Sequence, residues 1–229
     1  MVNEILTELQ KNTLTALFNN GMAERGFYLT GGTALSEFYL QHRLSDDLDF
    51  FTRKDSFLED AKYFAGVLES MGLVISSKDI GEEYSRFFVY HEEQEENKLK
   101  IEFARDVPAI MAPPVIHDKV VVDSFEDIAV NKICAIFGRL PSEPKDFCDL
   151  FFILKESRFE LDYLINRAKE KEAAFDKEDG ILAFAASLLN VSEFQMLPKM
   201  IKPLTLDELN SYIVPIAKKL IRQLRPRGE

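Results

Sequence analysis

The sequence predicts an α+β fold in which a sheet lobe is followed by a helical lobe. Segments rich in β-branched and aromatic residues, with apolar and polar positions alternating, lie in the first half of the 229-residue chain and are typical of strands. In the second half, apolar residues recur at helical spacing. Strands followed by a block of helices are typical of α+β proteins or of separate domains. We therefore expect a sheet lobe over residues 1–123 and a helical lobe, with no strand of the main sheet, over residues 124–229.

The first elements surround a pair of glycines. Apolar residues at helical spacing predict the opening helix, and Asp55 with Ser56 can cap a later one. In order, we expect a helix at about residues 3–24, a strand at Phe27–Thr30, a helix from Thr33 to about His42, a strand at Leu48–Thr52 and a helix ending near Gly72.

The remaining strands follow from alternation along the chain. They are expected at Leu73–Ile80, Arg86–His91, Leu99–Ala104 and Lys119–Val122, and an acidic loop or hairpin tip over His91–Asn97 separates two of them. In the segment that begins at Leu99, apolar residues alternate with Lys100 and Glu102, so these two charged residues share the face opposite the core.

The helical lobe starts at Ser124, which can cap a helix that runs to about Phe137. Apolar residues at helical spacing continue from there almost to the end of the chain. Further helices are expected at Lys145–Leu154, Leu161–Glu172, Ile181–Leu189 and Leu206–Leu224.

A glycine turn followed by an Asp-x-Asp segment carries the most chemistry. Residues two apart on a strand point to the same face, so Asp47 and Asp49 can share one metal ion. Mg²⁺ prefers oxygen ligands and is commonly held by one or two carboxylates together with substrate phosphates. Gly31 and Gly32 allow the backbone to approach phosphate oxygens closely. Alone, the glycine pair is also consistent with a plain turn, and the Asp-x-Asp segment with a solvated acidic run. Together, the two segments indicate a site for a nucleoside triphosphate and a metal.

A second group of charged residues lies in the helical lobe. Lys132 and Arg139 are two turns apart on one predicted helix and can bind a triphosphate, or they can belong to a solvated face. Asp146 and Asp149, three residues apart, share a face of the next helix. Either acid can orient one of the cations through an ion pair, and the alternative is simple solvent exposure.

Both segments resemble one known family. Gly31-Gly32-Thr33, a helix, and then His42-Arg43-x-Ser45-x-Asp47-Leu48-Asp49-Phe50-Phe51 look like the AbiEii/AbiGii nucleotidyltransferase-like toxins, within the DNA polymerase β-like nucleotidyltransferase superfamily. The segment from Lys132 through Arg139 to Lys145-Asp146-x-x-Asp149-Leu150 resembles the later block of that family. The family usually has Arg at the position of Lys145, and a lysine is a point charge that cannot chelate as the arginine fork does.

The resemblance implies a polymerase β-like sheet lobe and a set of site residues. It implies a third carboxylate on a neighbouring strand, for which Glu102 is the candidate, although an exposed strand face offers the same pattern without a function. Asp146 is implied to be functional and Asp149 structural. Ser45 can bind a phosphate or orient Asp47, and Arg43 has an alternative role as the ion-pair partner of Asp46. The implied catalytic residues are Asp47, Asp49, Lys132 and Asp146; the nucleotide-binding residues are Gly31, Gly32, Thr33, Ser45, Lys132 and Arg139; the ligands of Mg²⁺ or Mn²⁺ are Asp47, Asp49 and Glu102.

The implied function is metal-dependent transfer of a nucleotide from a nucleoside triphosphate to an acceptor, with tRNA as one candidate. The resemblance also implies a toxin of a bacterial toxin–antitoxin or phage-defence pair, with a cognate antitoxin. One alternative is a nucleotide-binding regulatory module without turnover, which loss of the third carboxylate would favour. A metal-dependent phosphoesterase would need more histidines or a denser carboxylate cluster.

Composition limits the partners and the location. The net charge of −11 argues against a broad nucleic-acid footprint and suits a protein partner with basic groups. The basic segment at residues 218–227 either relieves the C-terminal helix dipole or contacts RNA or an acidic partner. No apolar run is long enough to span a bilayer, and the N-terminus lacks signal-peptide features. We expect a cytoplasmic protein without membrane contact, with Cys134 and Cys148 as free thiols rather than zinc ligands.

Overall fold

The structure, a computed structural model, describes residues 5–224. The chain divides into two compact units: Met1–Tyr39 with Leu44–Ser124, and Leu40–Arg43 with Phe125–Glu229. The short segment Leu40–Arg43 thus leaves the first unit and joins the second. It is held there by backbone bonds, because the amides of Ile201 and Lys202 donate to the carbonyl of His42 at 2.8 and 3.0 Å.

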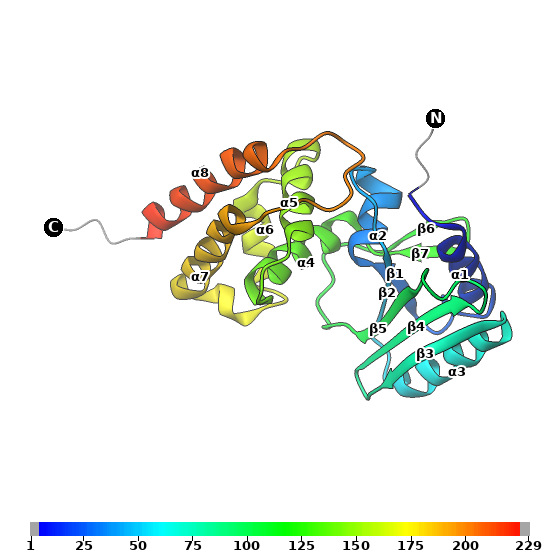
Figure 1. Cartoon of the computed structure of the whole chain (residues 1–229). Coiled ribbons are helices and arrows are strands. Elements are labelled where there is room, and N and C mark those ends of the chain that lie inside the picture. Colours follow the sequence, from blue (N-terminus) through cyan, green and yellow to red (C-terminus); the bar gives the residue numbers. More distant parts are fainter. Residues whose placement is uncertain (1–4, 225–229) are drawn as a thin grey trace. The chain divides into compact units, whose positions relative to one another are not determined.

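The first unit contains a seven-stranded mixed sheet, which confirms the predicted α+β class (Figure 1). The strand order is β3-β4-β5-β2-β1-β7-β6. β2 runs parallel to β5, β1 runs parallel to β7, and the other neighbours are antiparallel. The strands are β1 (Phe27–Thr30), β2 (Asp47–Thr52), β3 (Leu73–Ile80), β4 (Tyr84–His91), β5 (Leu99–Arg105), β6 (Val115–His117) and β7 (Val120–Val122).

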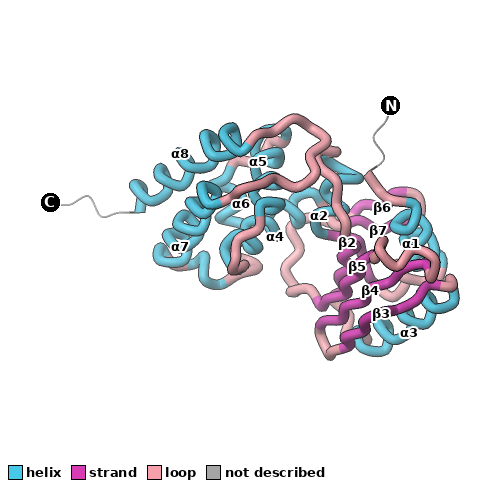
Figure 2. Tube along the Cα trace, in the orientation of Figure 1, coloured by secondary structure: helices cyan, strands magenta, loops and turns pink. Residues whose placement is uncertain are grey.

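Strand β6 was not expected from the sequence. It is only three residues long and follows two prolines, Pro113 and Pro114, so it shows almost no alternation. Pairing with β7 makes it a strand at the edge of the sheet. Within residues 5–224, every strand of this sheet ends by Val122, and Figure 2 shows the strands gathered in one unit.

Helices α1 (Glu8–Asn19), α2 (Gly31–Leu35) and α3 (Phe57–Ser70) belong to the first unit, and α2 continues as a turn of π-helix over Ser36–Leu40. The opening helix begins at Glu8 because Thr7 caps it, with Gln10 completing a capping box. It ends at Asn19 and is therefore shorter than predicted; residues 3 and 4 of the prediction lie outside the described residues. Ser56 precedes α3 without capping it; its hydroxyl instead donates to Asp60 at 2.6 Å.

Phenylalanines form the core between this sheet and its helices. Alternation along β2 and β5 directs Phe50 and Phe103 to the same face, where their rings stack 5.5 Å apart. Phe18 of α1 and Phe64 of α3 pack on these two rings at 6.2 and 5.9 Å. One face of the sheet is therefore covered by helices, and the charged residues that alternate with the core residues lie on the other face.

The second unit is helical. Its helices are α4 (Phe125–Gly138), α5 (Pro144–Glu156), α6 (Leu161–Ala168), α7 (Glu178–Leu188) and α8 (Leu206–Leu224), joined in part by 3₁₀ turns at Ala173–Asp176 and Leu189–Glu193. Pro144 opens α5, where its missing N–H costs no helical bond. Helix α6 ends at Ala168, earlier than predicted. Phe147, Phe175 and Phe184 are fully buried and anchor the core of this unit.

Three sequence features can be placed on this fold. No helix within residues 5–224 has both the length and the apolar content required to cross a bilayer. Cys134 and Cys148 are free thiols, as expected. Of the basic segment at residues 218–227, the part up to Leu224 belongs to α8, and Arg225 and Arg227 lie outside the described residues.

Candidate active site

The two predicted aspartates lie on β2 beside two charged residues of β5. In the parallel register of these strands, Asp47 is opposite Lys100 and Asp49 is opposite Glu102. Leu48 alternates with the aspartates and is fully buried on the helix-covered face. The register therefore places Asp47, Asp49 and Glu102, which we call the carboxylate trio, on one face of the sheet.

The glycine turn packs directly against this strand. Thr30, the last residue of β1, is opposite Asp49, and α2 begins at the next residue. Gly31 has a φ of +73°, and a Cβ atom there would overlap the Asp49 carboxylate. The buried Thr33 hydroxyl donates to the carbonyl of Asp47. The two halves of the sequence motif thus form one structure, and only glycine at position 31 allows the close approach.

Like charges crowd Asp49. Burial, followed by the charges of Glu102 and Asp47, raises the pKa of Asp49 to about 7. Burial also acts to raise the pKa of Glu102, but bonds from Tyr84, Lys100 and Arg86 outweigh it and hold that pKa at about 2. Desolvation and a neighbouring carboxylate both disfavour ionisation, so Asp49 is the member of the trio that ionises least readily.

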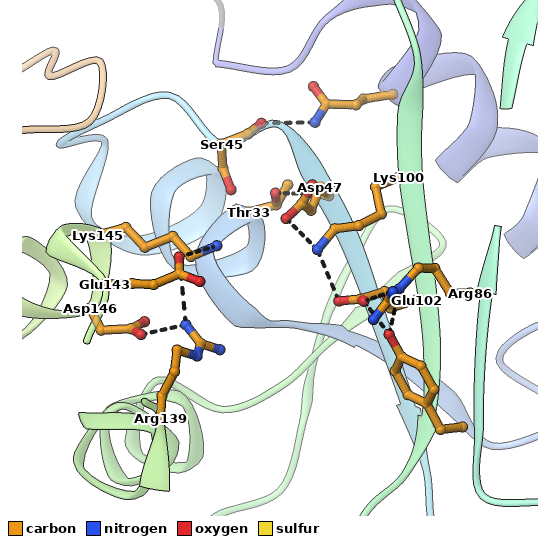
Figure 3. A network of polar contacts seen from close by, with 12 residues as sticks. Thr33, Ser45, Asp47, Arg86, Lys100, Glu102, Arg139, Glu143, Lys145 and Asp146 are labelled. Atoms are coloured by element: carbon orange, nitrogen blue, oxygen red, sulfur yellow. Dashed lines mark hydrogen bonds and ion pairs between the residues drawn. The ribbon is translucent and has the colours of Figure 1, made fainter. Parts of the chain in front are cut away.

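Cations and a phenol hold the other two carboxylates (Figure 3). The Lys100 ammonium is 2.8 Å from Asp47 Oδ2 and 3.1 Å from Glu102 Oε2. Glu102 Oε1 also accepts from Arg86 Nε at 3.0 Å and from the hydroxyl of Tyr84. The sequence interpretation gave no role to Lys100, Arg86 or Tyr84. Lys100 could have been found from the alternation that places it on the face of Glu102.

The trio suits a divalent cation by its donor chemistry. All its donors are carboxylate oxygens, which Mg²⁺ and Mn²⁺ prefer, and a cation there would relieve the repulsion at Asp49. Within the described residues no three Asp, Glu, His or Cys side chains converge closely enough to form a finished metal site. A metal bound by the trio would therefore require at least one of its carboxylates to exchange a present partner for the ion.

Ser45 precedes the Asp-x-Asp segment and is anchored through its backbone. Its carbonyl accepts a bond of 2.8 Å from Nε2 of the buried Gln10 on α1. This bond fixes the start of the segment that leads into β2.

The charged residues of the second unit form a cluster around Asp149, a fully buried residue of α5. Arg43 chelates its carboxylate, with Nε 2.7 Å from Oδ1 and Nη2 2.8 Å from Oδ2. Nε2 of His42 lies 2.7 Å from Oδ1, and the Lys132 ammonium lies 2.7 Å from Oδ2. The alternative in which Arg43 pairs with Asp46 is therefore wrong, because residues 40–43 fold into the second unit, where Arg43 pairs with Asp149.

Asp146 extends the same cluster by one helical turn. Its Oδ1 is 2.7 Å from the Lys132 ammonium, and its Oδ2 is 2.5 Å from Nη1 of Arg139. The side chains of Lys132 and Asp146 are only 9% and 2% exposed, so neither belongs to a solvated helix face. Lys145, at the position where the family usually has Arg, is partly exposed and pairs with Glu143 at 3.1 Å (Figure 3).

Burial and charge set the protonation of this cluster. Burial lowers the pKa of His42 despite its bond to Asp149, so the imidazole is neutral near pH 7. Burial works to raise the pKa of Asp149, but Arg43, Lys132 and His42 together hold it well below its usual value. Asp149 is therefore an ionised anchor for two cations. In the sequence analysis, His42 was part of the family motif but was given no role.

An Asp-x-Asp strand that follows a glycine turn and runs beside a strand with a third carboxylate is the arrangement that the resemblance to polymerase β-like nucleotidyltransferases implied. Comparison with known proteins then gives the family. Residues 14–222 match the family described as nucleotidyl transferase AbiEii toxin, type IV TA system. The chain belongs to this AbiEii family, and its nucleotidyltransferase activity and toxin class follow from that membership.

Individual proteins match the chain over most of its length. The chain is 31% identical over 179 residues to the uncharacterized protein aq_aa25 of Aquifex aeolicus, covering 75% of this chain and 78% of that protein. Its fold is similar to that of MenT4, a nucleotidyltransferase toxin from Mycobacterium tuberculosis, with a TM-score of 0.62, 15% identity and coverage of 95% and 83% of the two chains. JHP933 from Helicobacter pylori gives a TM-score of 0.59 at 22% identity, with coverage of 96% and 94%.

Proposed function

We propose that this nucleotidyltransferase requires Mg²⁺ or Mn²⁺ and transfers a nucleoside monophosphate from a nucleoside triphosphate to an acceptor hydroxyl, with tRNA as one candidate acceptor. We also propose that it acts as the toxin of a toxin–antitoxin or phage-defence pair and that a cognate antitoxin counteracts it. The observation that carries the metal dependence is the carboxylate trio, in which Asp49 lies against the glycine turn and opposite Glu102.

The reaction balances with the groups present. The acceptor hydroxyl oxygen forms a bond to the α-phosphorus, the bond from that phosphorus to the β-bridging oxygen breaks, and pyrophosphate leaves. A carboxylate of the trio is proposed to accept the hydroxyl proton. A divalent ion held by Asp47, Asp49 and Glu102 would supply charge neutralisation for the triphosphate.

The glycine turn is proposed to receive the triphosphate. Gly31 and Gly32 carry no side chain that would keep phosphate oxygens from the backbone, and the first N–H groups of a helix are free of intrahelical partners. Thr33 donates its hydroxyl to Asp47, so its side chain positions the metal-binding strand. Ser45, two residues before Asp47, is proposed to bind a phosphate through its hydroxyl.

Lys132 and Arg139 are proposed to neutralise phosphate charge. Both cations are held by Asp146, which would orient them and keep them charged. Their exposure differs, because Arg139 is 41% exposed and Lys132 only 9%. Arg139 therefore offers more of its surface to a phosphate than Lys132 does.

The alternative is a nucleotide-binding module without turnover. Loss of the third carboxylate would favour this alternative. Glu102 is present, lies opposite Asp49 in the strand register and is ionised. Turnover is therefore the favoured function. The alternative predicts that nucleotide binds but that no label is ever transferred.

The test is incubation of the full chain with each labelled nucleoside triphosphate, Mg²⁺ and total cellular RNA. We expect one RNA band to become labelled, and we expect neither chelator-treated protein nor the Asp47→Asn/Asp49→Asn double variant to label it. Unchanged circular dichroism would show that the variant is folded. Labelling that survives loss of both aspartates would contradict the proposed site, and nucleotide binding without labelling of any RNA would favour the non-catalytic module.

A further inference from the structure

Lys100 lies between carboxylates that the proposed function assigns to a divalent ion. Its ammonium is 2.8 Å from Asp47 Oδ2 and 3.1 Å from Glu102 Oε2, distances at which charge-assisted hydrogen bonds form. Figure 3 shows the side chain leaving its strand so that the ammonium stands between the two carboxylates. Lys100 thus supplies positive charge where the metal would supply it.

We propose that Lys100 is a built-in counter-cation that holds Asp47 and Glu102 in the metal-free enzyme and competes with the divalent ion for them. This inference rests on the proposed function, because it requires that the carboxylate trio binds the metal. Mg²⁺ draws its ligand oxygens to about 2.0–2.1 Å. An ammonium bonded to the same oxygens occupies the space the ion needs and carries the same sign of charge, so it has to move when the ion binds.

The surroundings of Lys100 allow this exchange. Its side chain is 25% exposed, and lysine has a flexible stem with a strongly hydrated head, so the ammonium can turn to water. Glu102 keeps its bonds to Arg86 and Tyr84 when Lys100 leaves. The carboxylate stays in place on its strand, and the released ammonium frees its Oε2 atom together with Oδ2 of Asp47.

The test measures Mn²⁺ binding to the full chain without nucleotide, by calorimetry. Lys100→Met removes the competitor, and we expect it to bind Mn²⁺ about fivefold more tightly than the parent, the scale of a partly exposed ion pair. Lys98→Met is the matched control. It makes the same charge change two residues away, where the lysine pairs with Glu95 at 3.2 Å. Any gain in Mn²⁺ affinity in Lys98→Met therefore measures the long-range effect of removing one positive charge.

Melting temperatures with and without Mg²⁺ give a second measurement, which also shows whether the variant is folded. We expect Mg²⁺ to raise the melting temperature of Lys100→Met more than that of the parent, since at a fixed concentration a ligand that binds more tightly stabilises the folded state more. Lys100→Gln should behave in the same way and replaces Lys100→Met if that protein does not fold. A role of Lys100 in stability alone would lower the melting temperature and leave divalent affinity unchanged.

The outcomes separate the two proposals. If Lys100→Met binds Mn²⁺ no more tightly than the parent while Asp49→Asn still abolishes binding, the role of Lys100 is wrong and the metal site stands. If Asp49→Asn leaves Mn²⁺ binding unchanged, the metal site itself is wrong. Absence of binding in both the parent and Lys100→Met overturns both.

Discussion

Asp49 has a carboxylate neighbour on its own strand and another on the adjacent strand. Glu102 is opposite it and Asp47 is two residues away. Ionisation of Asp49 therefore costs free energy in the folded chain that it does not cost in the unfolded chain. The register that builds the site is also a local source of instability.

This arrangement predicts an unusual pH dependence. The pKa of Asp49 is raised from 3.8 to about 7, so between these values the unfolded state releases a proton that the folded state keeps. Stability in chelator should fall as the pH rises from about 4 to about 7. Glu102, with its pKa lowered from 4.5 to about 2, loses its stabilisation as the pH falls between these two values, which is the opposite direction of change.

Melting temperatures from pH 5 to pH 8 check this prediction. In chelator, the melting temperature of Asp49→Asn should rise relative to that of the parent as the pH rises. At pH 8, saturating Mg²⁺ should stabilise only the parent, so the parent should then have the higher melting temperature. A constant difference across the pH range would show that Asp49 ionises normally.

Asp149 is the opposite case, a buried carboxylate surrounded by donors. Replacing Asp149 with Asn leaves Arg43 and Lys132 buried with much less compensation. Removing one partner of a buried ion pair costs about 3–5 kcal/mol, and we expect a loss of that order in urea unfolding at pH 7. The stabilisation by Asp149 is present above about pH 4 and declines in more acidic solution. The difference in free energy of unfolding between the parent and Asp149→Asn should therefore be smaller at pH 3 than at pH 7.

The matched control for Asp149 is Glu156→Gln. Glu156 pairs with Lys202 through side chains that are 36% and 35% exposed, and an exposed pair contributes only about 0–1 kcal/mol. Equal losses in the two variants would mean that the cluster around Asp149 does not anchor the second unit.

At the scale of elements, the turn from β1 into α2 positions the strand that carries the aspartates. Gly31 combines a positive φ with contact against Asp49, and Thr33 bonds to the Asp47 backbone. Turn and strand are therefore coupled, so a change in the turn should alter the aspartates.

Gly31→Ala tests this coupling. We expect a loss of about 1–2 kcal/mol from the left-handed backbone, a further loss from the overlap with Asp49, and weakened divalent binding. Gly72→Ala is the control for backbone strain alone, because Gly72 has a φ of +77° and an added methyl group would meet no atom within 4 Å, and Gly66→Ala in α3 has neither problem. Normal Mn²⁺ affinity in Gly31→Ala would contradict the coupling.

For the whole molecule, family membership predicts toxicity. Expression of the chain without an antitoxin should slow bacterial growth, and Asp49→Asn should relieve the effect. Asn keeps the shape of Asp and removes the charge that would hold the metal. Growth curves at matched protein levels measure this, and equal inhibition by Asp49→Asn would separate toxicity from nucleotidyl transfer.

The sequence by itself determined the elements and the motif. Alternation along the strand and helical periodicity are local properties, so β1 and α8 were predicted with the bounds they have, and spacing alone placed Asp47 and Asp49 on one face. The α+β class follows from the order of such segments along the chain, which can be read without any knowledge of contacts.

Only the tertiary structure decided which distant residues meet. The pairing of β2 with β5 brings Lys100 to Asp47, and the fold of residues 40–43 into the second unit gives Arg43 to Asp149 instead of Asp46. The three-residue strand β6 exists through its pairing with β7. Register, burial and ion pairing depend on segments far apart in sequence, and a local pattern carries no information about which of several charged residues will be the partner.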